Sequence, residues 1–134
     1  MLKLIGAVAM TVTVFPVVAL ADSVTNAREL FAQWAPTSVS LTPKGVLRVV
    51  LPQPRITDTI YYAAISAGFC FGPLLGKPLH DVGSVFILNE NQTQGWLFET
   101  GTNACEQINS ARGNQATVLI AGHSSVHTDT ANGL

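Results

Sequence analysis

The sequence of 134 residues contains few charged side chains. Lysine and arginine together number 7, aspartate and glutamate 8, and these residues make up 11% of the chain. A typical soluble domain has about 25%. With so few cations and a net charge of −1, the chain lacks the basic surface that binds nucleic acids or anionic membranes. We therefore expect no nucleic-acid partner.

Patterns typical of catalysis, phosphate binding or metal binding are missing as well. The two cysteines do not form a Cys-x-x-Cys motif, and there is no glycine-rich phosphate loop. Ser124 and Ser125 lack the second glycine of a nucleophile elbow. Glu90 and Glu99 stand at opposite ends of one predicted strand, about 30 Å apart at the usual rise per residue, too far for a carboxylate pair. The sequence predicts no cofactor and no metal.

One adjacent acid–base pair is present, His80-Asp81, in the glycine-flanked loop 76–83. Catalytic residues often lie in such loops, and an imidazole oriented by a carboxylate serves as a general base. Adjacent side chains diverge, however, so we favour a loop histidine beside a turn or capping aspartate. His80 remains the residue that a hydrolase of this sequence would use.

His123 and His127 are four residues apart, with Asp129 beyond them. This spacing suits two metal ligands on one helix face. The intervening residues are poor helix formers and no third strong ligand follows, so we favour a segment without a metal.

The first 21 residues are typical of a secretory signal peptide. Lys3 precedes an apolar run over 4–18, and Ala19-Leu20-Ala21 has the small side chains that a signal peptidase accepts. An uncleaved membrane anchor is the alternative. We expect cleavage before Asp22, which leaves no stable membrane anchor and predicts an exported protein, periplasmic or extracellular. Cleavage also removes Lys3, so six basic and eight acidic residues remain.

Two cysteines, Cys70 and Cys105, lie after the predicted cleavage site. An exported protein with an even number of thiols usually joins them. The alternative is a catalytic or metal-bound thiol, but nothing nearby indicates a lowered thiol pKa. We therefore predict a structural disulfide between them.

The sequence over 24–51 predicts a helix, a connector and a strand. Apolar residues at helical spacing favour a helix over 24–34, begun by the capping pair Asn26 and Glu29. A polar connector follows at 37–44. The β-branched run 46–51 is apolar on both faces, which is typical of an inner strand.

The second half predicts a helix over 57–68, whose final glycine ends it in the left-handed conformation. Strands over 84–88 and 95–99 form the clearest hairpin. A short helix over 103–113 carries the second cysteine. A last strand over 116–121 is the weakest of these predictions.

These elements predict an α+β domain over 22–121, followed by a flexible C-terminal tail over 122–134. The domain has a small mixed sheet of three or four strands, with helices packed on one face and one disulfide as a staple. Trp96 and Phe98 share one side of a strand and are expected in the core, whereas Tyr62 lies off the helical stripe and is expected to be more exposed.

The absence of catalytic patterns favours a small exported binding or accessory module, with an unknown protein or small-molecule partner. The alternative is a small exported hydrolase that uses His80, which would need that histidine to face a cleft with Arg48, Arg55 or Glu99. Asn91-Gln92-Thr93 also matches an N-glycosylation acceptor in a predicted turn.

Overall fold

The computed structural model describes residues 6, 8, 9, 11, 12 and 22–128. Apart from those five early positions, the predicted signal peptide lies outside the described residues. Asp129 and the rest of the chain after Thr128 also lie outside them. Everything below refers to the described part of the chain.

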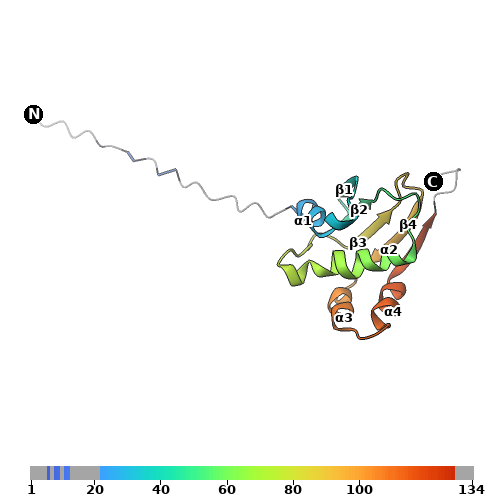
Figure 1. The fold of residues 1–134 in the computed structure, drawn as a ribbon. Coiled ribbons are helices and arrows are strands. Elements are labelled where there is room, and N and C mark those ends of the chain that lie inside the picture. The colour runs from blue at the N-terminus through green and yellow to red at the C-terminus, as the bar shows by residue number, and fades with distance from the viewer. Residues whose placement is uncertain (1–5, 7, 10, 13–21, 129–134) are drawn as a thin grey trace, which may run out of the picture.

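A mixed sheet of five strands forms the centre of the fold (Figure 1). Its strands follow one another in sequence order across the sheet: β1 Ser38–Leu41, β2 Val46–Val50, β3 Ser84–Leu88, β4 Gln94–Glu99 and β5 Ser124–Thr128. Only β2 and β3 are parallel, and the other neighbours are antiparallel. The predicted α+β class is confirmed, with five strands where three or four were expected.

The helices are α1 Ser23–Leu30, α2 Asp58–Ala63, α3 Ala104–Ser110 and α4 Gln115–Gly122. Between β2 and β3, α2 runs on through a π-helical segment, Ala64–Gly68, and a 3-10 turn, Phe69–Phe71. These segments cover one face of the sheet. The core lies between the two layers, around Phe31, Tyr61 and Phe98, each with at most 1% of its surface exposed.

Two helix starts differ in how the sequence specifies them. Thr57 caps α2 as predicted, because its hydroxyl accepts a hydrogen bond from the Ile60 N–H. The capping pair predicted at Asn26 and Glu29 is wrong: α1 begins three residues before Asn26, and Asp22 caps it through the Val24 N–H. The capping residue is thus Asp22, four residues before the one predicted.

The predicted end of the second helix is also wrong. Gly68 has a φ of −104° and the helical path continues through it. A Cβ at this position would come within 3.0 Å of the Phe31 ring and 3.1 Å of the Trp34 ring. The glycine therefore allows the π-helical segment to pack closely against Phe31 and Trp34, which follow α1, and does not form a left-handed cap.

Residues 37–44, predicted as a connector, contain the strand β1. The strand alternates exposed serines with Val39 and Leu41, which face the core, and it pairs antiparallel with β2. Two apolar residues in alternation are a weak pattern, since proline and polar residues flank them on both sides. Their burial becomes favourable only because β2 provides a neighbour.

The predicted last strand and tail are wrong over 116–128. The run 116–121 lies in α4, where Ile120 packs into the core, and the chain then returns as β5 along β4. The β-branched residues in this run favour a strand locally, but tertiary packing overrides that propensity. β5 also covers the edge of β4, which a flexible tail would have left exposed.

Candidate functional site

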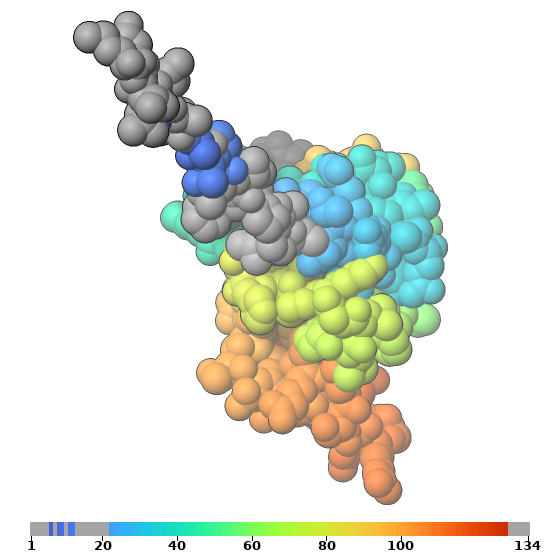
Figure 2. Space-filling model, turned by 90° about the vertical axis from the view of Figure 1, so that its left-hand side faces the viewer, coloured from blue at the N-terminus to red at the C-terminus, as the bar shows by residue number. Residues whose placement is uncertain are grey.

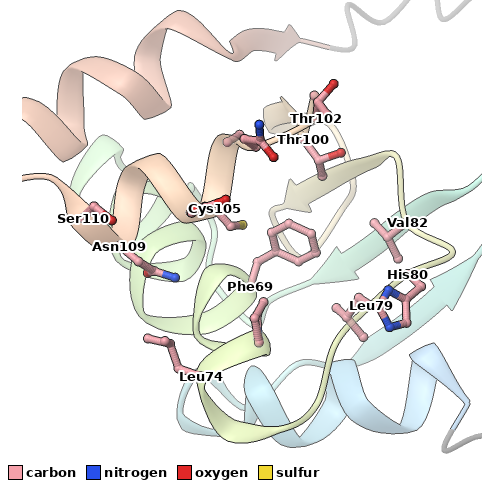
Figure 3. Close-up of a pocket in the computed structure, with 15 residues that line it drawn as sticks. Phe69, Leu74, Leu79, His80, Val82, Thr100, Thr102, Cys105, Asn109 and Ser110 are labelled. Carbon is pink, nitrogen blue, oxygen red and sulfur yellow. The ribbon is translucent and has the colours of Figure 1, made fainter.

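A pocket of about 570 Å³ lies beside the disulfide (Figure 3). Its walls come from segments far apart in sequence: the 3-10 turn after α2, the loop before β3, the loop after β4, and α3. Figure 2 shows the loop of residues 72–82, in yellow-green, between the N-terminal part in blue and cyan and the orange segment that follows β4.

The inner wall of the pocket is apolar. Phe69 and Val82 have 6% and 7% of their surface exposed, and half-buried Leu79 joins them. Leu74 is 61% exposed and stands at the opening near α3. An apolar wall with a few polar groups around it is the usual composition of a small-molecule site.

The polar side of the pocket has hydrogen-bond acceptors beside hydroxyl and amide groups that can also donate, among them Thr102 and Ser110. The Asn109 amide donates to the Cys70 carbonyl oxygen at 2.9 Å, which leaves its own carbonyl oxygen available. The Thr100 hydroxyl donates its only hydrogen to the Gly83 carbonyl oxygen at 3.1 Å. Glu106 adds a carboxylate on α3. These groups suit a ligand that brings hydrogen-bond donors.

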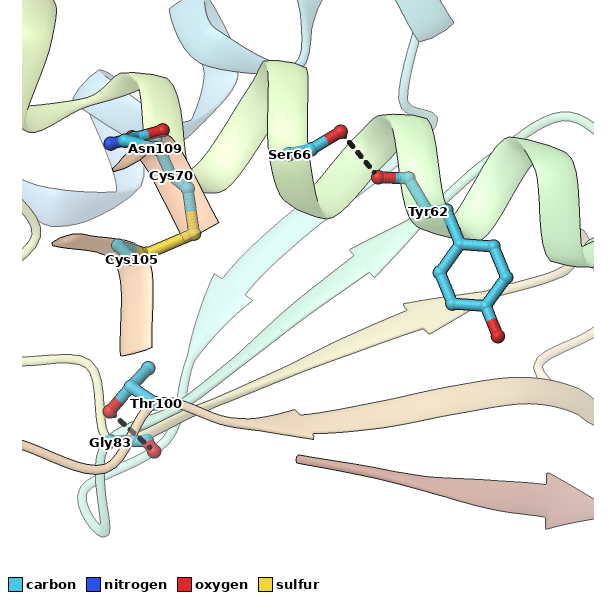
Figure 4. The surroundings of a disulfide bond; sticks show 7 residues. All are labelled: Tyr62, Ser66, Cys70, Gly83, Thr100, Cys105 and Asn109. Carbon is cyan, nitrogen blue, oxygen red and sulfur yellow. Dashed lines mark hydrogen bonds between the residues drawn. A yellow bond between two sulfur atoms is a disulfide. The ribbon is translucent and has the colours of Figure 1, made fainter. Parts of the chain in front are cut away.

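Three links hold the walls together (Figure 4). The predicted disulfide between Cys70 and Cys105 is present, with the Cα atoms 4.9 Å apart, inside the range that a bridge requires. The Asn109 bond joins the same two segments a second time, and the Thr100 bond joins the loop after β4 to the start of β3. The pocket is therefore preformed.

The loop that carries the apolar wall is also attached to α1. Lys77 forms an ion pair with Glu29, and the Ser23 hydroxyl donates to the Asp81 carboxylate at 3.4 Å. Asp81 thus binds α1 and does not orient His80.

His80 lines the pocket at its edge, beside Leu79 in Figure 3. It is exposed and makes no hydrogen bond or ion pair within the described chain. The pocket lining includes none of Arg48, Arg55 and Glu99. The structure therefore does not assemble around His80 the acid–base group that the hydrolase hypothesis requires.

The two C-terminal histidines occupy separate environments. The His123 ring lies against Phe98, with centroids 5.9 Å apart, whereas the His127 ring meets the edge of Phe86 on the other side of the sheet at 5.3 Å. No group of three or more potential metal ligands gathers anywhere among the described residues.

Arg48 lies on the sheet face away from the helices. Its guanidinium stands 5.7 Å from the centre of the Phe86 ring and donates to the Gln92 side chain at 3.0 Å. A cation over an aromatic face is stabilising. This explains how the inner strand β2 accommodates a charged residue on its open side.

On the helix side, Tyr61 connects α2 to the last two strands. Its ring stacks on Trp96 with centroids 5.1 Å apart, and its hydroxyl is 2.5 Å from that of Ser124. Burial raises the pKa of Tyr61 to about 12, although the hydrogen bond to Ser124 opposes the shift. Phe98 is fully buried as predicted, Trp96 packs against the core half-buried, and Tyr62 is more exposed than Tyr61.

The sequence did not predict the pocket. Its polar side comes from residues 100–110, which contain no catalytic pattern, and only Cys70 and Cys105 gave a signal that this segment meets the loop after α2. Searches among known protein families, curated proteins and solved structures found no match to the chain. None of the described helices has the length and apolar character needed to cross a bilayer.

Proposed function

We propose that this chain is an exported binding module that takes a small, mainly apolar molecule with hydrogen-bond donors, such as an amine or an alcohol, into the pocket beside the disulfide. The observation that carries the proposal is the preformed pocket of about 570 Å³, which lies within the usual size range of small-molecule sites. Export rests on the signal-like residues 1–21, and the disulfide is compatible with it.

The distribution of polarity supports this ligand class. Phe69, Leu79 and Val82 offer an apolar surface without a charge. Thr100 has used its only hydroxyl hydrogen within the fold and Asn109 one of its two amide hydrogens, so each has an acceptor oxygen available. A donor on the ligand would pair with these oxygens, whereas an anionic ligand would meet the Glu106 carboxylate and be disfavoured.

Fluorescence of 1-aminoanthracene, an apolar amine whose emission rises in apolar surroundings, tests the proposal. Ser110→Trp places a large side chain at an exposed position of the pocket lining. Gln107→Trp is the matched control, since Gln107 is exposed on the same helix but does not line the pocket. We expect saturable binding to the native protein and the control, and at least tenfold weaker binding to Ser110→Trp.

Equal binding to both tryptophan variants, or no saturable binding to any protein, would contradict the proposal. Replacing His80 by alanine distinguishes binding from hydrolysis. A binding module shows no esterase activity with or without His80, whereas esterase activity that is lost in this variant would favour the hydrolase instead.

Export is tested separately. The intact mass of protein recovered outside the cytoplasm should correspond to a chain that begins at Asp22. A full-length, membrane-extracted species would show that residues 1–21 act as an anchor.

A further inference from the structure

We propose that β5 is a dimerisation edge on which the β5 strand of a second copy of this chain pairs in antiparallel orientation. Within residues 22–128, β5 is the last strand of the sheet and pairs with β4 alone. Figure 1 shows it at the margin of the sheet opposite β1. An edge strand presents a row of unpaired backbone N–H and C=O groups, which natural proteins usually protect with charge, proline or a covering segment.

The two edges of this sheet differ in such protection. β1 has only four residues, lies between Pro36 and Pro43, is followed by Lys44, and packs against α1. β5 has five residues and contains neither proline nor a lysine, arginine, aspartate or glutamate. Its Val126 is 68% exposed. A charged residue follows each edge strand, Lys44 after β1 and Asp129 after β5, so the difference between the edges lies in the prolines beside β1 and in the longer, uncharged run of β5.

Pairing with β4 determines which backbone groups of β5 remain open. The Glu99 N–H donates to the His123 carbonyl oxygen at 2.9 Å, and hydrogen-bonded pairs recur at every second residue of an antiparallel ladder. The register then places Ser125 and His127 in the next two such pairs. The backbone groups of these residues face β4, so those of the residues between them point away from the sheet.

The outward-pointing residues are Ser124, Val126 and Thr128. A second β5 strand can pair with all of their N–H and C=O groups in one two-fold symmetric register. In it, Val126 lies opposite Val126 of the second copy, and Ser124 lies opposite Thr128 of the second copy. Homodimers of this kind are isologous, because the same patch serves both copies.

The side chains agree with this register. Val126 is the β4 partner of Trp96 and lies on the helix side of the sheet, so the two exposed valines would cover each other beside the indole rings. Ser125 would meet His127 of the second copy on the other face. No charged pair of like sign is brought together. Two five-residue strands bury less than the roughly 1,200 Å² of a stable interface, so the dimer depends on protein concentration.

Introduced cysteines test the register directly in the purified exported protein. Opposite residues of a hydrogen-bonded pair have Cα atoms about 5.5 Å apart, which suits a disulfide. Val126→Cys should therefore yield a covalent dimer under mild oxidation, joined at position 126 in both copies. Ser125→Cys is the control, since its counterpart in the dimer is His127 and its own cysteines do not meet. Equal cross-linking of both variants, or none at position 126, would overturn the proposal.

Sedimentation velocity tests the dimer without added thiols. Val126→Lys opposes two like charges at the centre of the strand pair, which destabilises cross-strand pairing. Ser38→Lys makes the same change in charge on the other edge strand, β1, where its partner on β2 is the uncharged Val50. We expect the native protein and Ser38→Lys to dimerise at high concentration, and Val126→Lys to require at least tenfold more protein. A native protein that stays monomeric throughout, or a Ser38→Lys variant that alone dissociates, would refute pairing through β5.

Discussion

Reduction of the disulfide should destabilise this domain substantially. Cys70 and Cys105 are 35 residues apart. Closing a loop of this size lowers the entropy of the unfolded chain by an amount worth about 4 kcal/mol at 25 °C, and measured losses for native bridges in small exported domains are typically about 2–5 kcal/mol. The Asn109 bond to the Cys70 carbonyl oxygen joins the same segments without the bridge. It should keep the reduced pocket wall close to its native position.

Urea unfolding followed by circular dichroism measures the effect, on the native protein with and without reductant and on a Cys70→Ala, Cys105→Ala double variant. We expect a loss of about 2–4 kcal/mol in the free energy of unfolding, similar for reduction and substitution, with native secondary structure retained in the absence of urea. Asn109→Leu should lower the free energy of unfolding by about 1 kcal/mol in the oxidised protein. The loss should be larger once the bridge is reduced, because the hydrogen bond and the disulfide join the same two segments. Equal stability of the oxidised and reduced proteins would refute the structural role of the bridge.

Three further outcomes follow from particular contacts. Deletion of residues 123–134 should lower the free energy of unfolding by roughly 3–5 kcal/mol, because β4 loses its hydrogen-bonded neighbour and Tyr61 its bond to Ser124. Chemical denaturation measures this, and an unchanged midpoint would contradict the pairing of β5. Gly95→Ala should lower the free energy of unfolding by at least about 2 kcal/mol, since an added Cβ would come 1.9 Å from the Ile87 carbonyl oxygen. Gly76→Ala is the control, because a Cβ there meets no neighbouring atom and the substitution only strains the backbone. In a Tyr62→Phe variant, which leaves Tyr61 as the only tyrosine, tyrosinate absorbance should still rise well above pH 10 in the folded protein, because burial, the largest cause of the raised pKa, remains when the smaller contribution of Tyr62 is removed. Because the folded protein keeps this proton above the ordinary tyrosine pKa of about 10, stability should fall as the pH rises from 10 to 12. Ionisation near pH 10 in a protein that is still folded would contradict the burial of Tyr61.

Elements with a strong local pattern were predicted well. The apolar run of β2, the hairpin of β3 and β4, and the Thr57 cap of α2 are each specified within a few residues of sequence. The disulfide followed from the expected compartment and the cysteine count, and the structure confirms it.

Elements that depend on distant partners were not predicted. β1 has only two apolar residues, and their burial depends on β2. The segment 116–121 has strand-forming residues but folds as α4, because a helix there places Ile120 in the core and returns the chain to β4. The candidate pocket was missed for the same reason, since its walls meet only when α3 is joined to the turn after α2.

Methyl nuclear magnetic resonance of leucine- and valine-labelled protein during titration with 1-aminoanthracene tests the central claim most directly. Binding in the pocket should shift the methyl signals of Leu79 and Val82, which line it, and leave those of Leu97 and Val126 on the sheet unchanged. Shifts confined to Leu97 or Val126, or no shifts at saturating probe, would contradict the assignment of this pocket as the binding site.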